Sequence, residues 1–271
     1  MKTVKRYIRL YKVFITQFFK VIMQSKVDFL MGLFGFFFTQ IAGILFLYLV
    51  FEQIPFLEGW SFEQLIFIYG FAQIPRGIDH LFTDYIWKVG SWMIVNGEFD
   101  RYMLRPMNIF FQIIAEQLQP DALGELLVGM ILVVRGLSQG IVVIDTMHIL
   151  MFIASIIAGA IIYTAIKLLF CSIAFWTKMS DPFMLAAYAL ADFAKYPIEI
   201  YNTPVRLVIT WVIPFAFVAY LPACYFLGLD TIMGMKGPTI IGVEWLMAIV
   251  SFIIAYGLFH KGTKVYESCG N

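Results

Sequence analysis

"DFLMGLFGFFFTQIAGILFLYLVF", residues 28–51, is an apolar run whose single charged side chain is the aspartate at its start. A helix needs roughly 20 apolar residues to cross the hydrocarbon core of a bilayer. The whole chain is 61% hydrophobic and 14% charged, whereas charged residues make up about 25% of soluble domains. These features predict an integral membrane protein that forms a single domain over residues 1–271.

Comparable apolar stretches recur along the chain and predict an all-α fold with six transmembrane helices. The stretch that follows Pro120 is the shortest of them. The predicted spans cover roughly residues 28–51, 64–86, 120–137, 147–170, 205–226 and 242–260.

The first 26 residues have a different pattern. Basic side chains recur along one helical face and apolar side chains along the other. Such a helix lies in the headgroup region of a membrane, where anionic lipid attracts its positive charges. Residues 2–26 are therefore predicted to form an interfacial amphipathic helix in contact with membrane lipid.

Lysine and arginine indicate the orientation, because they are enriched on the cytoplasmic side of membrane proteins. Most of the 19 basic residues fall in the N-terminal segment, the 87–119 loop, the 171–206 stretch and the tail. The opposite loops instead carry acidic residues such as Glu58, Asp145 and Glu244. The pattern predicts a multi-pass protein of the cytoplasmic membrane with both termini in the cytoplasm. We expect no nucleic-acid partner.

"NGEFDRYMLRP", residues 96–106, is a charged interruption between two apolar segments. Gly97 offers a turn, and Phe99, Tyr102 and Met103 form an apolar stripe at helical spacing, which Pro106 ends. An amphipathic helix of this kind sets its apolar face into a groove on a partner and uses its charges for register. The alternative is a helix that rests on lipid. The candidate partner-binding residues are Gly97, Phe99, Asp100, Arg101, Tyr102, Met103, Arg105 and Pro106.

Two stretches resemble a known family. "GEFDRYMLRPMNIFFQ", from residue 97, and "YPIEIYNTPVRLVITWVIPFAFVAYLPACYFLG", residues 196–228, are similar to segments of ABC transporter permeases of the second, exporter-type membrane family. The resemblance covers essentially the whole chain. It implies that residues 97–106 are the coupling helix that docks on an ATP-hydrolysing subunit. It also implies that residues 205–240 form the fifth span followed by outer re-entrant helices.

The same resemblance implies an assembly. Two copies of an ABC ATPase would bind ATP and Mg²⁺, and a second permease, identical or homologous, would complete the pathway. The chain has no GxxxxGK[ST] phosphate-binding motif, so we expect it to bind no cofactor and no metal and to have no catalytic site of its own. The expected activity is export of a hydrophobic or amphipathic substrate, such as a lipid-like molecule, a drug or a peptide.

Four residues within the predicted spans are candidates for the substrate pathway. Arg76 and Asp79 are three residues apart, which allows a pair on one helical face; charges in spans serve function or structural pairing. Pro214 and Pro222 interrupt an apolar run and suggest either broken helices beside a cavity or ordinary packing kinks.

"DP" at residues 181–182 predicts the start of a helix, since aspartate caps helices and proline is favoured in the first turn. Because this stretch follows a predicted span, we expect a cytoplasmic amphipathic helix that ends before Tyr196. Such a helix contacts either solvent or the ATPase.

Two rival functions have specific sequence tests. "GLSQG", residues 136–140, matches GxSxG, the motif of a serine nucleophile, but Ser138 needs a histidine within hydrogen-bond reach to act as a protease. A secondary transporter or channel, working without ATP, is typically built from inverted repeats with charges at the midplane. No clear repeat is present in the sequence.

Overall fold

The computed structural model describes residues 2–24, 26–143, 145–229 and 231–268. Within these ranges the chain is helical except for loops and one two-stranded hairpin. The elements in chain order are α1 (Lys2–Gln24), α2 (Lys26–Gln53), α3 (Phe62–Thr83), α4 (Ile86–Lys88), the π-helical turn η1 (Val89–Met93), α5 (Asp100–Met103), α6 (Ile109–Glu116), η2 (Pro120–Ala122), α7 (Leu123–Ser138), α8 (Thr146–Ser172), α9 (Ala174–Thr177), α10 (Asp181–Ala191), η3 (Asp192–Lys195), η4 (Ile198–Ile200), α11 (Thr203–Leu207), the π-helical turn η5 (Val208–Val212), η6 (Phe215–Phe217), α12 (Tyr220–Phe226), β1 (Thr231–Ile232), β2 (Met235–Lys236) and α13 (Gly237–Val265).

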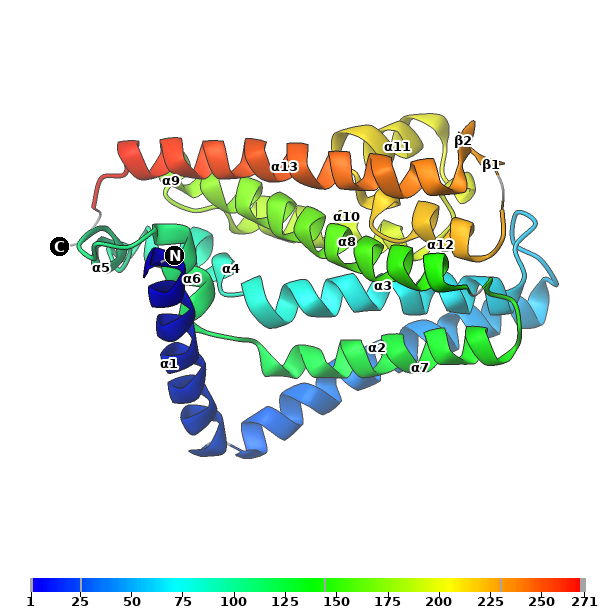
Figure 1. Cartoon of the computed structure of the whole chain (residues 1–271), viewed down its shortest axis with the longest axis horizontal. Coiled ribbons are helices and arrows are strands. Elements are labelled where there is room, and N and C mark those ends of the chain that lie inside the picture. The colour runs from blue at the N-terminus through cyan, green and yellow to red at the C-terminus, as the bar shows by residue number, and fades with distance from the viewer. Residues whose placement is uncertain (1, 25, 144, 230, 269–271) are drawn as a thin grey trace.

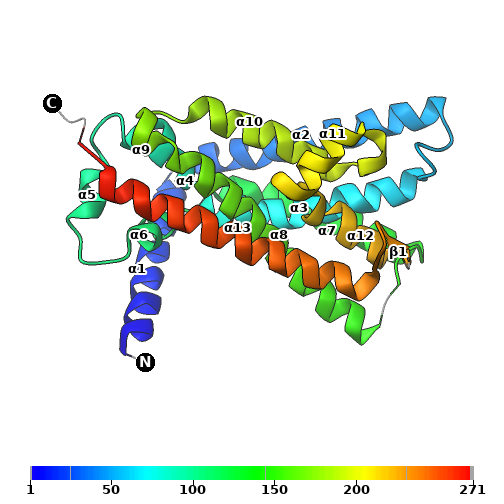
Figure 2. The same ribbon diagram turned by 90° about the horizontal axis from the view of Figure 1, so that it is seen from above.

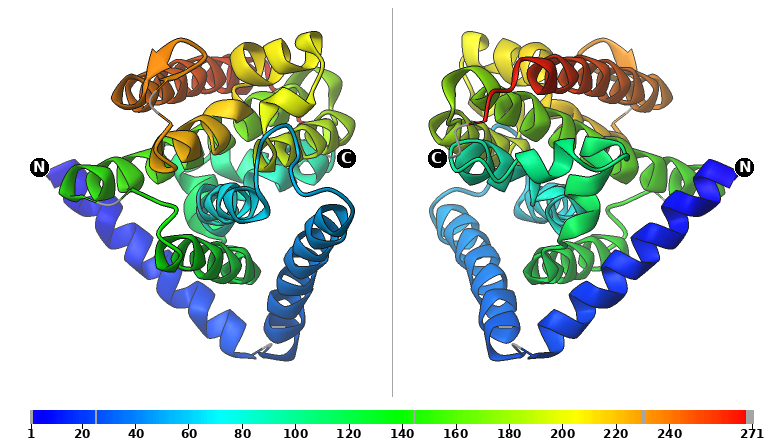
Figure 3. Two further views of the ribbon diagram at one scale, coloured as in Figure 1. Left: turned by 90° about the vertical axis from the view of Figure 1, so that its right-hand side faces the viewer. Right: turned by 90° about the vertical axis from the view of Figure 1, so that its left-hand side faces the viewer.

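The long helices run side by side along the longest axis of the molecule (Figure 1). Both chain ends lie at one end of this bundle, with α5, α6 and α9, whereas the β-hairpin and the α2–α3 loop lie at the other (Figures 1 and 2). Helix α1 lies across the bundle, and α1 and α2 diverge from a common corner like the arms of a V (Figure 3). This arrangement suits an α1 that lies along a membrane surface while the other long helices cross the membrane.

Helices α3 and α7 pack closely because glycine faces glycine at their crossing. A β-carbon at Gly70 would lie 2.4 Å from Cβ of Leu132, and one at Gly129 would lie 2.9 Å from the carbonyl oxygen of Gly70. Small residues let backbones approach in this way, and in lipid such packing contributes much of the association between helices.

Within the described ranges, three helices are long and apolar enough to cross a bilayer by length and composition: α2, the continuous stretch Thr146–Thr177, and α13. Helix α2 fully buries only Gln40 and Leu47, and many of its apolar side chains face outward, as expected beside lipid. The chain is therefore an all-α membrane protein. Helices α3 and α7 occupy the predicted second and third spans, but α3 carries several charges and α7 has only 16 residues.

The predicted fifth span, residues 205–226, is broken. The helical stretches Thr203–Val212 and Phe215–Phe226 meet at an angle of 71°. Pro214 stands at the break, where its ring and missing N–H prevent a continuous helix. The bend lies beside α8 and α13, because Ile213 and Pro214 line a cavity together with Ile166 of α8 and Ile254 of α13.

Residues 181–200 run along α3 instead of lying free at the cytoplasmic end. Near the C-terminal end of α3, the Tyr188 hydroxyl donates a hydrogen bond of 2.6 Å to Asp84. Further along, the Lys195 ammonium lies 5.4 Å from the centre of the Tyr69 ring. This segment therefore follows α3 antiparallel, from its last turn to its second.

The same segment ends beside the loop that precedes α3. Glu199 accepts a hydrogen bond of 2.7 Å from the Tyr220 hydroxyl, and the Tyr220 ring packs edge-on against Trp60, just before α3 begins. The helical segment begins at Asp181 and ends at Lys195, before Tyr196, as predicted, although Ser180 is its N-cap. It is not a free surface helix. Its apolar residues pack against α3 and α8, which a sequence pattern cannot distinguish from packing on a membrane surface or a partner.

Candidate functional site

The segment before α5 turns sharply at Gly97. Its φ of 72° lies in the left-handed region, which glycine adopts at little cost. The turn brings Phe99 back so that its backbone N–H donates to the carbonyl of Met93. Helix α5 is a single turn, Asp100–Met103, which confirms the local helix but makes it shorter than the predicted range.

The apolar stripe of α5 faces its own chain. Phe99 and Tyr102 are both fully buried, and the Phe99 ring packs edge-on against Phe175 and Tyr266, with centroids 5.2 and 5.0 Å away. These two side chains are therefore not available to a partner, contrary to the prediction that the whole stripe docks outward. The exposed residues lie at the end of the helix.

The exposed tip consists of Met103, Leu104, Arg105 and Pro106. The Leu104 side chain is 84% exposed. Methionine and arginine, both present here, are enriched in protein interfaces. We call residues 103–106 the exposed tip.

Helix α6 holds α5 in place. Gln112 donates through Nε2 to the carbonyls of Tyr102 and Met107, at 3.1 Å each. Glu116, one turn further along, accepts from the Tyr102 hydroxyl at 2.6 Å and pairs with Arg101 at 2.7 Å. Burial and the hydrogen bond to Glu116 raise the pKa of Tyr102, so the phenol remains a neutral donor. The two helices thus form one unit.

The C-terminal tail also binds α5. Both carboxylate oxygens of Asp100 accept hydrogen bonds, from the Tyr266 hydroxyl at 2.8 Å and from Ser268 Oγ at 2.7 Å. The Lys178 ammonium donates to the Glu267 carbonyl at 3.4 Å. Asp100, predicted to contact a partner, is therefore bonded to its own chain just after α13.

Asn108 joins three helices. Its side-chain oxygen caps α6 by accepting from the Phe111 N–H at 2.9 Å, and its Nδ2 donates to the Tyr256 hydroxyl of α13 at 2.7 Å. Its own backbone N–H donates to the Tyr7 hydroxyl of α1 at 3.3 Å. A displacement of α5 and α6 would therefore reach both α1 and α13 through this residue.

Replacing Asn108 with alanine should lower the melting temperature of the purified chain, because it removes both the cap of α6 and the bond to Tyr256. Loss of a cap alone costs about 1 kcal/mol. The matched control is Asn202→Ala, which removes the equivalent cap of α11, a hydrogen bond to the Val205 N–H. Thermal denaturation in detergent should show the larger decrease for Asn108→Ala; equal decreases would argue against the link to α13.

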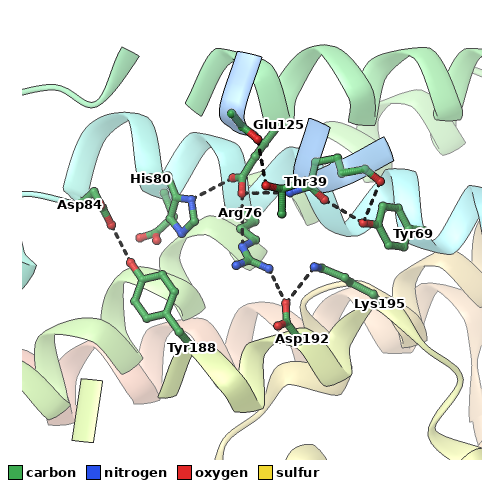
Figure 4. A network of polar contacts seen from close by, with 12 residues as sticks. Thr39, Tyr69, Arg76, His80, Asp84, Glu125, Tyr188, Asp192 and Lys195 are labelled. Carbon is green, nitrogen blue, oxygen red and sulfur yellow. Dashed lines mark hydrogen bonds and ion pairs between the residues drawn. The ribbon is translucent and has the colours of Figure 1, made fainter. Parts of the chain in front are cut away.

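A network of buried charges lies further inside the bundle (Figure 4). Arg76 of α3 lies 3.6 Å from Glu125 of α7 and 2.7 Å from Asp192. The second Glu125 oxygen is 2.9 Å from His80 Nδ1, and Asp192 also pairs with Lys195 at 2.8 Å. The network thus joins α3, α7 and η3.

A second group of charges adjoins the first, toward the C-terminal end of α3. The Lys167 ammonium of α8 lies 2.8 Å from Asp79 and 3.0 Å from Asp84. Thr164 donates a hydrogen bond to Asp79 at 2.8 Å, and Tyr188 donates to Asp84. Charges buried in membrane proteins need such partners, because unpaired ions are costly in hydrocarbon.

The expected pair between Arg76 and Asp79 is wrong: each binds residues on other helices. Their spacing of three residues allowed a pair, but the true partners of Arg76 are 49 and 116 positions away in sequence, at Glu125 and Asp192. No local signal could identify them. The sequence offered only indirect hints. Glu125 lies near the start of a predicted span and Asp192 in an apolar stretch, and contact with lipid explains neither carboxylate well.

The two prolines have different surroundings. Pro214 lines a cavity of about 300 Å³ between α8 and α13, in keeping with a broken helix beside a cavity. Pro222 is buried in the first turns of α12, where its ring fits the packed core.

Glu244, expected in an outer loop, lies inside α13. Its side chain is fully buried and accepts hydrogen bonds from Ser155 Oγ of α8 at 2.9 and 2.7 Å. The helix begins at Gly237, several residues before the predicted span. The pair therefore ties α8 to α13.

Ser138 has the bonds of an ordinary helix-end residue. Its hydroxyl donates to the carbonyl of Arg135 at 2.8 Å. His148 Nδ1 lies 2.9 Å from Asp145, and its ring stacks on Tyr225. Within the described ranges Ser138 has no hydrogen bond to a histidine, so the geometry gives the GxSxG motif no activating base.

Comparisons with known proteins give one result. A family model described as "ABC-2 family transporter protein" matches residues 36–270. No curated protein matches the chain, and no solved structure does.

Proposed function

The chain belongs to the ABC-2 family of transporter membrane proteins, and from this we propose that it is the permease subunit of an ATP-driven exporter. Permeases of this family are membrane subunits without catalytic activity of their own, and they normally work with an ABC ATPase. The observation that carries the proposal for this chain is the exposed tip. It is held firmly by α6 and the C-terminal tail, yet presents Leu104 and Arg105 to solvent.

The proposed topology has six crossings and both termini in the cytoplasm. They are made by α2, α3, α7, α8, residues 181–200 and α13. The support for the fifth crossing is its path along the length of α3. Residues 203–226 then form a bent hairpin on the outer side, in place of the fifth span first assigned to residues 205–226. An even number of crossings agrees with the two chain ends lying at the same end of the bundle (Figure 1).

In the proposed mechanism, two ATPase subunits bind ATP and Mg²⁺ beneath two permeases, which are identical or homologous. Closure of the ATPases displaces the exposed tip. Helix α5 is tied to α6 and, through Tyr266, to the tail just after α13. Asn108, which caps α6, is bonded to Tyr7 of α1 and Tyr256 of α13, so the displacement reaches helices of the membrane domain. A ligand changes such an equilibrium only by binding the two states differently. The cargo is hydrophobic or amphipathic.

The proposal is tested by purifying the tagged chain from its native membrane. We expect an ATPase with a phosphate-binding loop to copurify, and Mg-ATP to be required for cargo release from reconstituted liposomes. The Ser138→Ala variant serves as a control and should retain both properties. Transport by the purified chain alone, without ATP, would instead support a secondary transporter.

A further inference from the structure

A cavity of about 550 Å³ lies between the start of α6 and the end of α13, at the end of the bundle that holds both chain ends (Figure 1). Its apolar lining includes Ile109 and Phe110 of α6 and Phe259 of α13. The Phe110 ring packs edge-on against Phe259, with centroids 6.4 Å apart, and so joins the two helices beside the cavity. We call this space the α6–α13 cavity.

The basic side chains of the α6–α13 cavity lack partners. His260 and Lys264 both line it, and both reach solvent. Within the described ranges, neither the His260 ring nor the Lys264 ammonium has a hydrogen-bond or ion-pair partner, and no lining residue is acidic. Histidine carries at least one ring N–H in either protonation state. The cavity therefore offers a positive charge and N–H donors to an anion, with no carboxylate to repel it.

Tyr256 of α13 adds a further donor to this lining. Its hydroxyl oxygen accepts a hydrogen bond of 2.7 Å from Asn108 Nδ2, and its own hydrogen has no acceptor in the described part of the chain. Residues 256, 260 and 264 follow one another at intervals of four, so their side chains lie on one helical face in successive turns. Three donors thus point to one side of α13.

The same face of α13 continues as an exposed apolar surface. At about 100° per residue, Ile249 and Ile253 fall on the face that carries Tyr256 and His260. The Ile249 and Ile253 side chains are 50% and 65% exposed. At about 1.5 Å per residue, Ile249 lies roughly 16 Å along the helix from His260. A ligand with its polar group in the cavity can therefore place an apolar tail along this part of α13.

Helix α1 sets the depth of the cavity in the membrane. Asn108, which lines the cavity, donates through its backbone N–H to the Tyr7 hydroxyl of α1 at 3.3 Å. The Tyr7 ring also packs edge-on against Phe111 of α6, with centroids 4.6 Å apart. A basic amphipathic helix such as α1 lies at the boundary between headgroups and acyl chains. The cavity is therefore at the level of the lipid phosphates.

We infer that the α6–α13 cavity binds the headgroup of an anionic phospholipid from the leaflet that adjoins α1. The phosphate accepts hydrogen bonds from Lys264, His260 and Tyr256, and the acyl chains lie along the exposed apolar face of α13. Basic pockets between membrane helices bind anionic headgroups in this way. The site goes beyond the proposed export function, since it requires neither ATP nor an ATPase. A bound lipid would bridge α6 and α13, the two helices that hold α5.

The inference is tested by native mass spectrometry of the purified full chain, with phosphatidylglycerol added after detergent exchange has removed native lipid. Lys264→Gln should weaken binding of the first phosphatidylglycerol at least about fivefold, the effect of one basic residue near anionic lipid. Met107→Trp should weaken it as well, because Met107 lines the cavity and the larger ring fills it without changing charge. The matched control is Lys261→Gln. Lys261 is exposed near the same end of α13 but does not line the cavity, so its loss should leave the affinity almost unchanged.

Folding of each variant is checked by thermal denaturation without lipid. Equal affinities of Lys264→Gln and Lys261→Gln would overturn the inference. So would equal affinities of the unchanged chain for phosphatidylglycerol and for zwitterionic phosphatidylcholine. Binding of inorganic phosphate as tight as that of phosphatidylglycerol would assign the cavity to a free anion and reject the lipid. Because the assay contains neither ATP nor cargo, its outcome is independent of the proposed export, which has its own test in liposomes.

Discussion

Replacing Lys167 with methionine should destabilise the chain by about 3–5 kcal/mol, the usual effect of removing one partner from a buried ion pair. The Lys167 side chain is 3% exposed and contacts both Asp79 and Asp84. Methionine has a similar length, so the change leaves little cavity but strands two carboxylates. Unfolding of the purified chain in detergent, followed by heat or by denaturant, should show this loss directly.

Two further variants separate the effect of the lost charge on stability from the effect of changed packing. Lys167→Met combined with Asp79→Asn should recover a large part of the lost stability, because the amide carries no charge to strand. Arg135→Gln breaks the exposed pair with Glu63, in which the arginine is 48% exposed, and should cost less than about 1 kcal/mol. A Lys167→Met variant as stable as Arg135→Gln would show that the inner charge group does not stabilise the fold.

Replacing an apolar and a basic side chain of the exposed tip with acidic ones, by Leu104→Asp and Arg105→Glu together, should abolish capture of the ATPase while leaving the permease folded. Both side chains point away from their own chain, so the fold loses almost no contacts. If they lie at the centre of the interface, their loss should cost at least about 2 kcal/mol of binding, or roughly thirtyfold in affinity. Copurification of the ATPase and cargo-dependent ATP hydrolysis measure the effect.

The control for this pair is Lys261→Glu, a charge reversal at an exposed position near the end of α13, on the same side of the molecule. It should leave ATPase capture close to normal. Unchanged capture by the tip variant, with normal membrane insertion, would contradict docking through residues 103–106.

The sequence predicted the helical membrane class correctly, because apolar runs long enough to cross a bilayer have few other uses. The runs at 28–51, 147–170 and 242–260 became α2, α8 and α13 with shifts of several residues at their ends. The resemblance drawn from residues 97–112 and 196–228 was confirmed by the family match over residues 36–270. Long, uniform apolar runs of this kind form the predicted helices in the folded structure.

Shorter patterns were ambiguous. The stripe formed by Phe99, Tyr102 and Met103 was predicted to face a partner, but the tail and α9 cover Phe99, and Tyr102 is buried with its hydroxyl bonded to Glu116 of α6. Residues 181–195 were assigned to the cytoplasmic surface, but they pack along α3. An apolar face shows that a helix needs a neighbour and does not say which neighbour it finds.

The sequence alone determined that this protein resides in a membrane and that it forms helices long enough to cross a bilayer, since both follow from the number and spacing of apolar residues. Only the tertiary structure decided which ions pair, which face of α5 remains open and where the chain bends back at Pro214. Each of these depends on residues such as Arg76 and Asp192, which are distant in sequence and meet only when helices pack. Hydrophobicity adds up along a chain, whereas an ion pair exists only between two positions in space.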